Sequence, residues 1–419
     1  MSKYIPRLID KSLKKELEAF GAVLITGPKW CGKTTSGLRH SKSALFLQDP
    51  DNRSQNLEMA SLSPSLLLEG EKPRLLDEWQ DAPSLWDAVR HSVDRLGETG
   101  LYILTGSVMV DESKLAHSGT GRISRLQMRT LSLFESGFSN GGVSLEKLFA
   151  KEEPSSKSDS SLEDIAEVIV RGGWPSSIDK SLDIARRQVG GYCQSIIRSE
   201  ISTSDGVQRD EEKLESFLRS YSRHISTRAA LTTIVNDLSG KEKELDRRTA
   251  PEYIRALSKI YVVEELKAWN PRLRSKTAIA TSPTRHFTDP AIAAYFLDAG
   301  PKDLLSDLKT FGLLFESLVI RDLRIYAQSL SGRVYHYRDH AGLEADAVIH
   351  LSCGAYGLVE VKLGGEAVDR AAENLLKLRD KIDTSMMPET SFMAVITATG
   401  YAYKRPDGVY VIPIGCLRD

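Results

Sequence analysis

The stretch AVLITGPKWCGKTT, residues 22 to 35, decides the fold of the first part of the chain. It opens with an apolar run that is typical of a buried strand and then matches the pattern GxxxxGK[ST] at Gly27, Gly32, Lys33 and Thr34. The glycines allow successive backbone N–H groups to turn inward around phosphate oxygens, and the helix expected next would point its amino terminus at them. The pattern therefore predicts a phosphate-binding loop between a strand and a helix.

Roles within this loop follow from the same chemistry. We expect the lysine of the motif, Lys33, to reach the β- and γ-phosphates, and the hydroxyl of Thr34 to bind Mg²⁺. The cofactors predicted by the motif are therefore ATP and Mg²⁺. The residues expected to line the nucleotide are Gly27, Pro28, Lys29, Trp30, Cys31, Gly32, Lys33, Thr34 and Thr35.

A second apolar segment ends in two carboxylates, in the string LLDE at residues 75 to 78. A strand of this kind would deliver Asp77 to the hydrated Mg²⁺ and Glu78 to the water that attacks the γ-phosphate. The next expected strand, residues 101 to 104, ends in the string TGS. We take Ser107 as the sensor of the γ-phosphate, with Thr105 as the second choice.

An arginine could complete hydrolysis from a neighbouring subunit. The string SGTG ends at Gly121 and is followed by Arg122, with Arg125 close behind. An arginine finger from Arg122 would stabilise the charge of the transition state in trans. The alternative is an arginine that is solvated or paired locally.

Length and composition limit the number of domains, the location of the protein and its possible partners. A chain of 419 residues is too long for one ordinary domain, so we expect three or four units. No apolar stretch approaches the roughly 20 residues that span a bilayer, and no signal peptide is recognised, so we expect a cytoplasmic protein without membrane contact. The cysteines are widely spaced and are expected to be reduced thiols. A net charge of −1 indicates that contact with nucleic acid would need a local basic patch.

The organisation changes after the first sheet. Between residues 20 and 107 short apolar runs alternate with helical patterns, which predicts a parallel α/β sheet. The string KEEPSSKSDSSLE, residues 151 to 163, is rich in Ser and charge and is interpreted as a flexible connection at a domain boundary. A series of helices follows from about residue 206 to 290. Beyond residue 311 we expect a helix, three strands, a helix and closing strands.

The carboxyl-terminal part contains a second cluster of charged residues. In the expected strand YGLVEVK, alternation places Glu360 and Lys362 on one face. Asp346 would lie on the paired strand, and Glu316 on the preceding helix. Together they resemble the PD-(D/E)xK nuclease arrangement.

The chemistry of this cluster fits cleavage of a phosphodiester. The two carboxylates of Asp346 and Glu360 could hold Mg²⁺, while Lys362 orients and activates a water. Glu316 completes the predicted catalytic set. Three interpretations stay open here: active cleavage, silent binding of nucleic acid, and a structural or protein-docking role.

A winged-helix unit is the interpretation of the helical segment that ends near residue 300. An apolar stripe on its best-defined helix, which includes Tyr253 and Leu257, would face the core. Basic side chains around this helix could contact DNA phosphates without reading the sequence: Lys241, Lys243, Arg247, Arg248, Arg272, Arg274 and Lys276. The alternative is a solvated helical face in a module that packs between its neighbours.

Seven strings in order resemble a known group of proteins, the bacterial and archaeal AAA-type ATPases that carry a C-terminal domain of unknown function. The strings are YIPRLID (4 to 10), GPKWCGKTT, LLDEWQ, YILTGS, GR (121 to 122), RGGWP (171 to 175) and TRHFTDPAIAAYFL (284 to 297). The resemblance covers nearly the whole chain. It strengthens the assignment of an ATPase more than it defines a substrate.

The resemblance implies an α/β fold class: a P-loop AAA+ ATPase domain with a small helical lid, a winged-helix domain and a restriction-endonuclease-like α/β domain. The boundaries that we expect are 1–150 for the ATPase core, 151–205 for the lid, 206–300 for the winged helix and 301–419 for the nuclease-like domain.

Two functions are compatible with these features. The preferred one is an oligomeric ATPase, expected as a hexameric ring, that couples ATP hydrolysis to binding, translocation or remodelling of DNA, with branched DNA as a plausible substrate. Metal-dependent nuclease activity would come from the C-terminal domain. The alternative is a nucleotide-controlled switch or scaffold that binds a protein partner and has a silent C-terminal domain.

Overall fold

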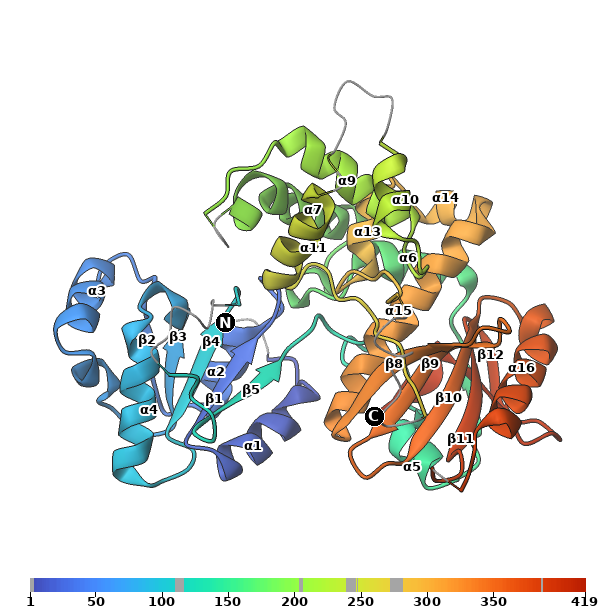
Figure 1. Cartoon of the computed structure of the whole chain (residues 1–419), viewed down its shortest axis with the longest axis horizontal. Coiled ribbons are helices and arrows are strands. Elements are labelled where there is room, and N and C mark those ends of the chain that lie inside the picture. The colour runs from blue at the N-terminus through green and yellow to red at the C-terminus, as the bar shows by residue number, and fades with distance from the viewer. Residues whose placement is uncertain are drawn as a thin grey trace. The chain divides into compact units, whose positions relative to one another are not determined.

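The computed structural model describes residues 4–109, 117–202, 206–238, 246, 248–271, 282–385 and 387–419. The chain divides into two compact units, Met1–Thr130 with Lys259–Tyr261 and Leu131–Ser258 with Val262–Asp419 (Figure 1). Of the basic side chains that we predicted to contact DNA, only Arg248 is described. The others, Lys241, Lys243, Arg247, Arg272, Arg274 and Lys276, lie outside the described residues.

A five-stranded parallel sheet forms the centre of the first unit, in the order β2-β3-β4-β1-β5. Its strands are β1 (Ala22–Thr26), β2 (Ser43–Phe46), β3 (Arg74–Asp77), β4 (Tyr102–Gly106) and β5 (Ile123–Gln127), and its helices are α1 (Ile9–Ala19), α2 (Lys33–His40), α3 (Arg53–Leu62) and α4 (Ser84–Leu96). The predicted parallel α/β sheet is confirmed. Because all strands run the same way, β1, β3 and β4 end at one edge.

Alternation along the strands builds a core on both faces of this sheet. Val23 of β1 belongs to a buried apolar cluster that also contains Leu13 of α1. Its neighbour Leu24 belongs to a second cluster with Trp86 of α4. A strand buried on both faces has no polar alternation, which explains why the first four residues of AVLIT are all apolar.

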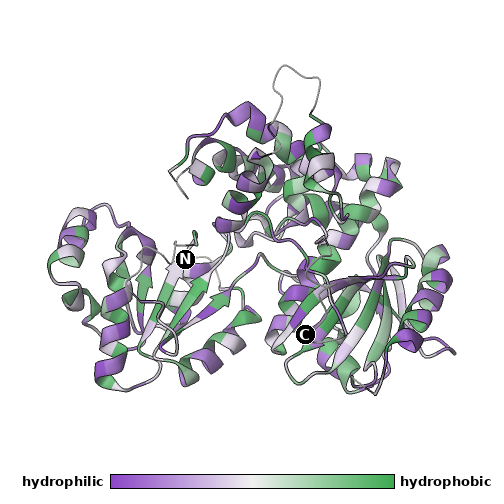
Figure 2. Ribbon diagram, in the orientation of Figure 1, coloured by the Kyte–Doolittle hydropathy of each residue, from purple (hydrophilic) through white to green (hydrophobic). Residues whose placement is uncertain are grey.

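The second unit contains a seven-stranded mixed sheet, in the order β7-β12-β13-β11-β10-β9-β8 (Figure 1). Its strands are β7 (Ser156–Ser158), β8 (Gly332–Arg338), β9 (Glu344–Leu351), β10 (Tyr356–Lys362), β11 (Phe392–Thr397), β12 (Gly400–Lys404) and β13 (Tyr410–Pro413). Helix α15 (Leu308–Ser329) contacts β8 and β9, and α16 (Val368–Lys381) contacts β10 and β11. Figure 2 shows the hydrophobic colour concentrated on the central strands.

The expected order of helix, three strands, helix and closing strands is present here, but the sheet has two further strands. β7 lies inside the segment that we interpreted as a flexible connection, so that interpretation is wrong for Ser156–Ser158. It pairs with β12, which we did not predict. The partner strand supplies the hydrogen bonds that hold this polar segment in place.

The remaining elements of the second unit are mostly helical. They are α5 (Leu145–Phe149), α6 (Leu162–Arg171), α7 (Leu182–Ser195), α9 (Glu211–Arg223), α10 (Leu231–Asn236), α11 (Thr249–Lys259), α13 (Pro290–Phe296) and α14 (Pro301–Ser306), with a small sheet of β6 (Val143–Ser144) and β14 (Leu417–Arg418). The division of this region into lid, winged helix and nuclease-like domain stays a prediction. No helix in the described part of the chain is long and apolar enough to cross a membrane.

A buried arginine joins distant segments of the second unit. The guanidinium of Arg321 in α15 lies 3.0 Å from Asp289 Oδ2 and 2.8 Å from Asp322 Oδ1. Asp289 also accepts the backbone N–H of Gly173, and Asp322 accepts that of Leu133. The strings RGGWP and TRHFTDPAIAAYFL therefore meet α15 through charges that are removed from water.

Arg321→Met tests how much this buried network stabilises the second unit. It leaves the carboxylates of Asp289 and Asp322 without their cation, so the free energy of unfolding should fall by about 3–5 kcal/mol. The matched control is Arg187→Ala, which removes an exposed helical ion pair with Asp183 and should cost less than about 0.5 kcal/mol. Urea unfolding followed by circular dichroism measures both. Equal losses in the two variants would contradict a special role for the buried pair.

Candidate functional site

The P-loop leaves the carboxyl end of β1 and enters α2 through two glycines with positive φ. Gly27 has φ +150° and Gly32 has φ +103°. A Cβ on Gly27 would lie only 2.1 Å from the carbonyl oxygen of Met128. The first glycine is therefore required both by its backbone conformation and by the close approach of the segment after β5.

Lys33 is the cation of this loop. Its side chain is buried, and Nζ donates to the carbonyl oxygens of Gly27 at 3.0 Å and Pro28 at 2.9 Å. Both acceptors are neutral, so no anion balances the ammonium in these two contacts. A buried ammonium whose two hydrogen-bond acceptors are neutral carbonyls suits a ligand that brings negative charge.

Asp77 at the end of β3 is the polar centre of the sheet edge. Its Oδ1 accepts the hydroxyls of Thr34 at 2.8 Å and Thr105 at 2.6 Å. Burial raises the pKa of the Asp77 carboxyl, although both hydroxyls oppose the shift. The motif threonine of the P-loop and the carboxylate predicted to hold Mg²⁺ thus lie in direct contact. Their oxygens are the ligands that this cation prefers.

Glu78 follows in a left-handed conformation, with φ +55°. The hydroxyl of Ser107 donates to its Oε2 at 3.2 Å, and the amide of Gln80 donates to the same oxygen. Thr105 accepts the backbone N–H of Glu78 at 3.1 Å while it donates to Asp77. Ser107 therefore contacts the carboxylate predicted to act on water, whereas Thr105 connects the two acidic residues.

Other residues predicted to line the nucleotide differ in exposure. Cys31 is fully buried, and Thr35 is exposed at the start of α2. Trp30 is 59% exposed and has φ +64°, a left-handed conformation that is uncommon for a bulky residue. Pro28 is buried and Lys29 is half-buried. The loop therefore exposes Trp30 from a left-handed backbone position.

Arg122 lies at the other edge of the sheet. It immediately precedes β5, whose first residue pairs with the first residue of β1. The P-loop follows the other end of β1, about 16 Å away for five residues at about 3.3 Å each. Arg122 Nε donates to Asp94 Oδ1 at 2.7 Å, and the side chain is half exposed. It does not meet the P-loop of its own chain.

Sequence reasoning missed two residues of this unit. Gln80 fixes the carboxylate of Glu78, and Arg7 donates to the carbonyl of Cys31 in the P-loop. Both lie in strings that carry the family resemblance, LLDEWQ and YIPRLID. Their presence in those strings was the available signal, but their contacts follow only from the fold.

The second candidate cluster lies in the other unit, on β9 and β10. Lys362 Nζ lies 2.6 Å from Glu360 Oε2 and 3.4 Å from Asp346 Oδ2. The backbone N–H of Val361 donates to the same oxygen of Asp346 at 2.7 Å. The predicted pair of carboxylates and the lysine are therefore brought together.

The electrostatics of this cluster favour a cation. Burial, and then the charge of Asp346, raise the pKa of Glu360 to about 8. Burial and the same carboxylate also raise the pKa of Glu316 well above its ordinary value. Although burial alone would lower it, the carboxylates raise the pKa of Lys362 above its usual range. The ammonium of Lys362 therefore interacts with three carboxyl groups in this cluster, those of Glu316, Asp346 and Glu360.

One observation tests whether a metal fits here. Glu360 Oε1 is buried and has no hydrogen-bond partner, so one acceptor of the cluster is left over. Within the described ranges, no three His, Cys, Asp or Glu side chains converge on a metal position. A cation would thus be held by the carboxylates of Asp346 and Glu360 and would take its remaining oxygens from water or substrate, as Mg²⁺ usually does.

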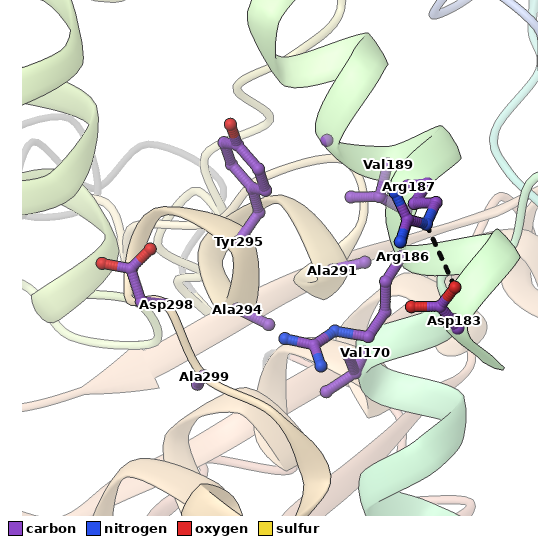
Figure 3. A pocket seen from close by; sticks show the side chains of 11 residues that line it. Val170, Asp183, Arg186, Arg187, Val189, Ala291, Ala294, Tyr295, Asp298 and Ala299 are labelled. Atoms are coloured by element: carbon purple, nitrogen blue, oxygen red, sulfur yellow. Dashed lines mark hydrogen bonds and ion pairs between the residues drawn. The ribbon is translucent and has the colours of Figure 1, made fainter.

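A separate cavity of about 320 Å³ opens between α6, α7 and α13 (Figure 3). Val170, Val189 and Ala294 contribute apolar walls, and Arg186 and Tyr295 contribute polar groups. It is distant in sequence from both clusters. None of our predicted site residues lines it.

Three family matches cover successive parts of the chain. Residues 19–136 match an AAA domain, residues 162–303 match a domain of unknown function (DUF8612), and residues 311–417 match a domain of unknown function (DUF4143). Each covers less than half of the chain. Together with the parallel sheet and its P-loop, they confirm an AAA-type ATPase domain followed by a C-terminal DUF4143 domain.

Several individual proteins are similar to this chain at low sequence identity. The uncharacterised proteins Mb2031c of Mycobacterium bovis and Rv2008c of Mycobacterium tuberculosis are each 23% identical over 371 residues, which cover 87% of this chain and 75% of theirs. The Walker-type ATPase PABY2304 of Pyrococcus abyssi has a TM-score of 0.44 at 14% identity, over 70% of this chain and 96% of its own. The Aeropyrum pernix ORC1 protein in complex with DNA has a TM-score of 0.23 at 14% identity, over 71% and 95%. Both structural likenesses are loose.

Gly27→Ala tests the close packing of the P-loop. The added methyl group would collide with the carbonyl of Met128, so the loop must move and nucleotide binding should weaken at least about tenfold, a loss of about 1.4 kcal/mol. Gly191→Ala in the second unit is the control, because a methyl group there meets nothing within 4 Å. Equilibrium binding of ADP measures the effect. Unchanged affinity in Gly27→Ala would contradict the described loop geometry.

Proposed function

We propose that the chain is an oligomeric ATPase that couples ATP hydrolysis to the binding, translocation or remodelling of DNA. The observation that carries the ATPase part is the contact of Thr34 with Asp77, beside Lys33 and Glu78, at one edge of a parallel sheet. These are the group types needed for phosphate binding, metal binding and water activation. That DNA is the substrate is the more specific part of the proposal.

The residues around the P-loop have distinct roles in this reaction. The backbone N–H groups between Gly27 and Thr35 cradle the phosphates, and Lys33 exchanges its two carbonyl acceptors for phosphate oxygens. Thr34 and Asp77 are the residues that would hold Mg²⁺, which neutralises charge on the phosphates when bound. Glu78, oriented by Ser107 and Gln80, accepts a hydrogen bond from the attacking water.

The location of Arg122 supports the proposed oligomer, for which a hexameric ring is the expected form. A guanidinium at the edge opposite the P-loop could reach a nucleotide only on a neighbouring subunit. Its pairing with Asp94 is exposed and therefore weak, so the side chain can leave it when a neighbour binds. The local ion pair is the competing role for this arginine.

The C-terminal cluster supports DNA as the substrate class. Asp346 and Glu360 would hold Mg²⁺, which would polarise a phosphodiester and lower the pKa of a bound water. Lys362 would orient that water, and Glu316 would add a buried carboxyl to the site. The unpartnered Oε1 of Glu360 supports this arrangement over a purely structural ion pair.

The alternative function is a nucleotide-controlled switch that binds a protein partner. In that case the ion pairs of Lys362 with Asp346 and Glu360 would only stabilise the sheet. Of the basic side chains predicted to contact DNA, only Arg248 belongs to the described residues. A silent C-terminal cluster and an active P-loop would together favour the switch.

Two variants separate binding from hydrolysis. Lys33→Ala should abolish binding of ATP, because it removes the buried ammonium that is proposed to bind the phosphates. Glu78→Gln should keep ATP bound but lower the turnover rate about 100-fold or more, since the amide cannot accept a proton from water. Steady-state phosphate release and equilibrium ATP binding check both. Normal turnover in either variant would refute the assigned role.

Cleavage of DNA tests the C-terminal cluster. The wild-type chain should cut duplex or branched DNA only when Mg²⁺ is present, and Asp346→Asn or Lys362→Ala should reduce the rate about 100-fold or more. Lys377→Ala is a matched control, because its exposed ammonium lies 3.9 Å from Glu373 on α16. Gel assays with Mg²⁺ and Mn²⁺ measure cleavage. If the wild-type chain cuts none of the substrates, the cluster is silent.

A further inference from the structure

One arginine bonds both the P-loop and the segment through which the chain leaves the ATPase unit. Arg7 is buried, with 7% of its surface exposed. Its Nη1 donates to the carbonyl of Cys31 at 2.7 Å, and its Nη2 donates to the carbonyls of Arg129 at 2.8 Å and Thr130 at 3.3 Å. Thr130 is the last residue of the first unit before the chain enters the second.

The two segments joined by Arg7 also touch each other directly. The backbone N–H of Met128 donates to the carbonyl of Thr26 at 2.7 Å, just before the P-loop. The carbonyl of Met128 lies where a Cβ on Gly27 would be. The two segments are therefore in close contact at Thr26, Gly27 and Met128.

Arg7 is itself held against the helix that follows the P-loop. Its backbone N–H donates to Asp10 Oδ2 at 2.9 Å. Asp10 also contacts His40 Nε2 at 3.2 Å and the hydroxyl of Tyr4, which lies 3.2 Å from Ser36 Oγ. Since Ser36 and His40 belong to α2, the backbone of Arg7 is tied to that helix while its side chain reaches the exit segment.

The chemistry of this contact needs a guanidinium. Buried backbone carbonyls must be satisfied, and here one planar group with several fixed donors satisfies carbonyls in two segments at once. Lysine has a single ammonium on a flexible stem and does not reproduce this fork. A change in the P-loop backbone at Cys31 is therefore transmitted to residues 129–130 through one rigid group.

We propose that Arg7 is a positioning residue that links the nucleotide state of the P-loop to the conformation of the chain leaving the ATPase unit. The inference rests on the proposed function, since it requires that the P-loop binds a nucleotide. Binding fixes the loop around the phosphates, and Arg7 then fixes the carbonyls of residues 129–130.

The test combines nucleotide binding with hydrogen exchange in the full-length chain. N-methylanthraniloyl-ADP, a fluorescent ADP analogue, reports affinity, and exchange of the backbone amides of residues 128–130 reports the exit segment. Arg7→Gln and Arg7→Lys should each raise the Kd about tenfold, and the slowing of amide exchange that nucleotide causes in the wild type should disappear. Arg95→Ala, at an exposed position of α4, should match the wild type in both measurements.

Folding is checked in each variant by circular dichroism and thermal unfolding. A folded Arg7 variant with wild-type affinity and wild-type protection of residues 128–130 would overturn the inference. Loss of folding in Arg7→Gln leaves Arg7→Lys to decide, and loss of folding in both would make Arg7 purely structural and also overturn it. Failure of the wild type to bind the analogue would instead sink the proposed function, so the two failures are distinguishable.

Discussion

The half-buried carboxylate of Asp77 makes the contacts on which the nucleotide site depends. It ends β3 and accepts hydroxyls from Thr34, on the helix after the P-loop, and from Thr105, at the end of β4. The parallel register of β1, β3 and β4 brings these residues to one edge, and their hydrogen bonds hold the edge together. The Thr105 hydroxyl also accepts the backbone N–H of Glu78, so it positions the backbone of that residue relative to Asp77.

Two buried arginines hold distant segments together, one within each unit. Within the first unit, Arg7 ties the P-loop to residues 129–130. Within the second unit, Arg321 ties Asp289 and Asp322, and through them the backbone of residues 133 and 173. Both arginines satisfy groups that would otherwise be buried without partners, which is costly in a low-dielectric interior. The motifs YIPRLID, RGGWP and TRHFTDPAIAAYFL are far apart in the sequence, and each contains a residue that takes part in one of these two networks.

The sequence predicted the parts of the fold that depend on local pattern. The continuous apolar runs of β1, β3 and β4 and the P-loop motif could be located because strand burial and phosphate binding both constrain neighbouring residues. Alternation likewise located Glu360 and Lys362 on β10, and the structure brings them to Asp346.

Contacts between distant segments could not be predicted in this way. Arg321 and Asp322 lie in a helix where charges would ordinarily face water, yet both are buried. β7 is short and polar and is a strand only because β12 pairs with it at the edge of the sheet. Arg7 and Gln80 act through carbonyl and carboxylate partners that no spacing rule identifies.

The measurement that tests the central claim most directly is the steady-state rate of ATP hydrolysis by the full chain, with and without duplex, single-stranded and branched DNA, at low and moderate salt. The account predicts Mg²⁺-dependent hydrolysis that at least one form of DNA accelerates, with a stimulation that weakens as salt increases because phosphate contacts release counterions. Hydrolysis that no form of DNA changes at either salt concentration would contradict it.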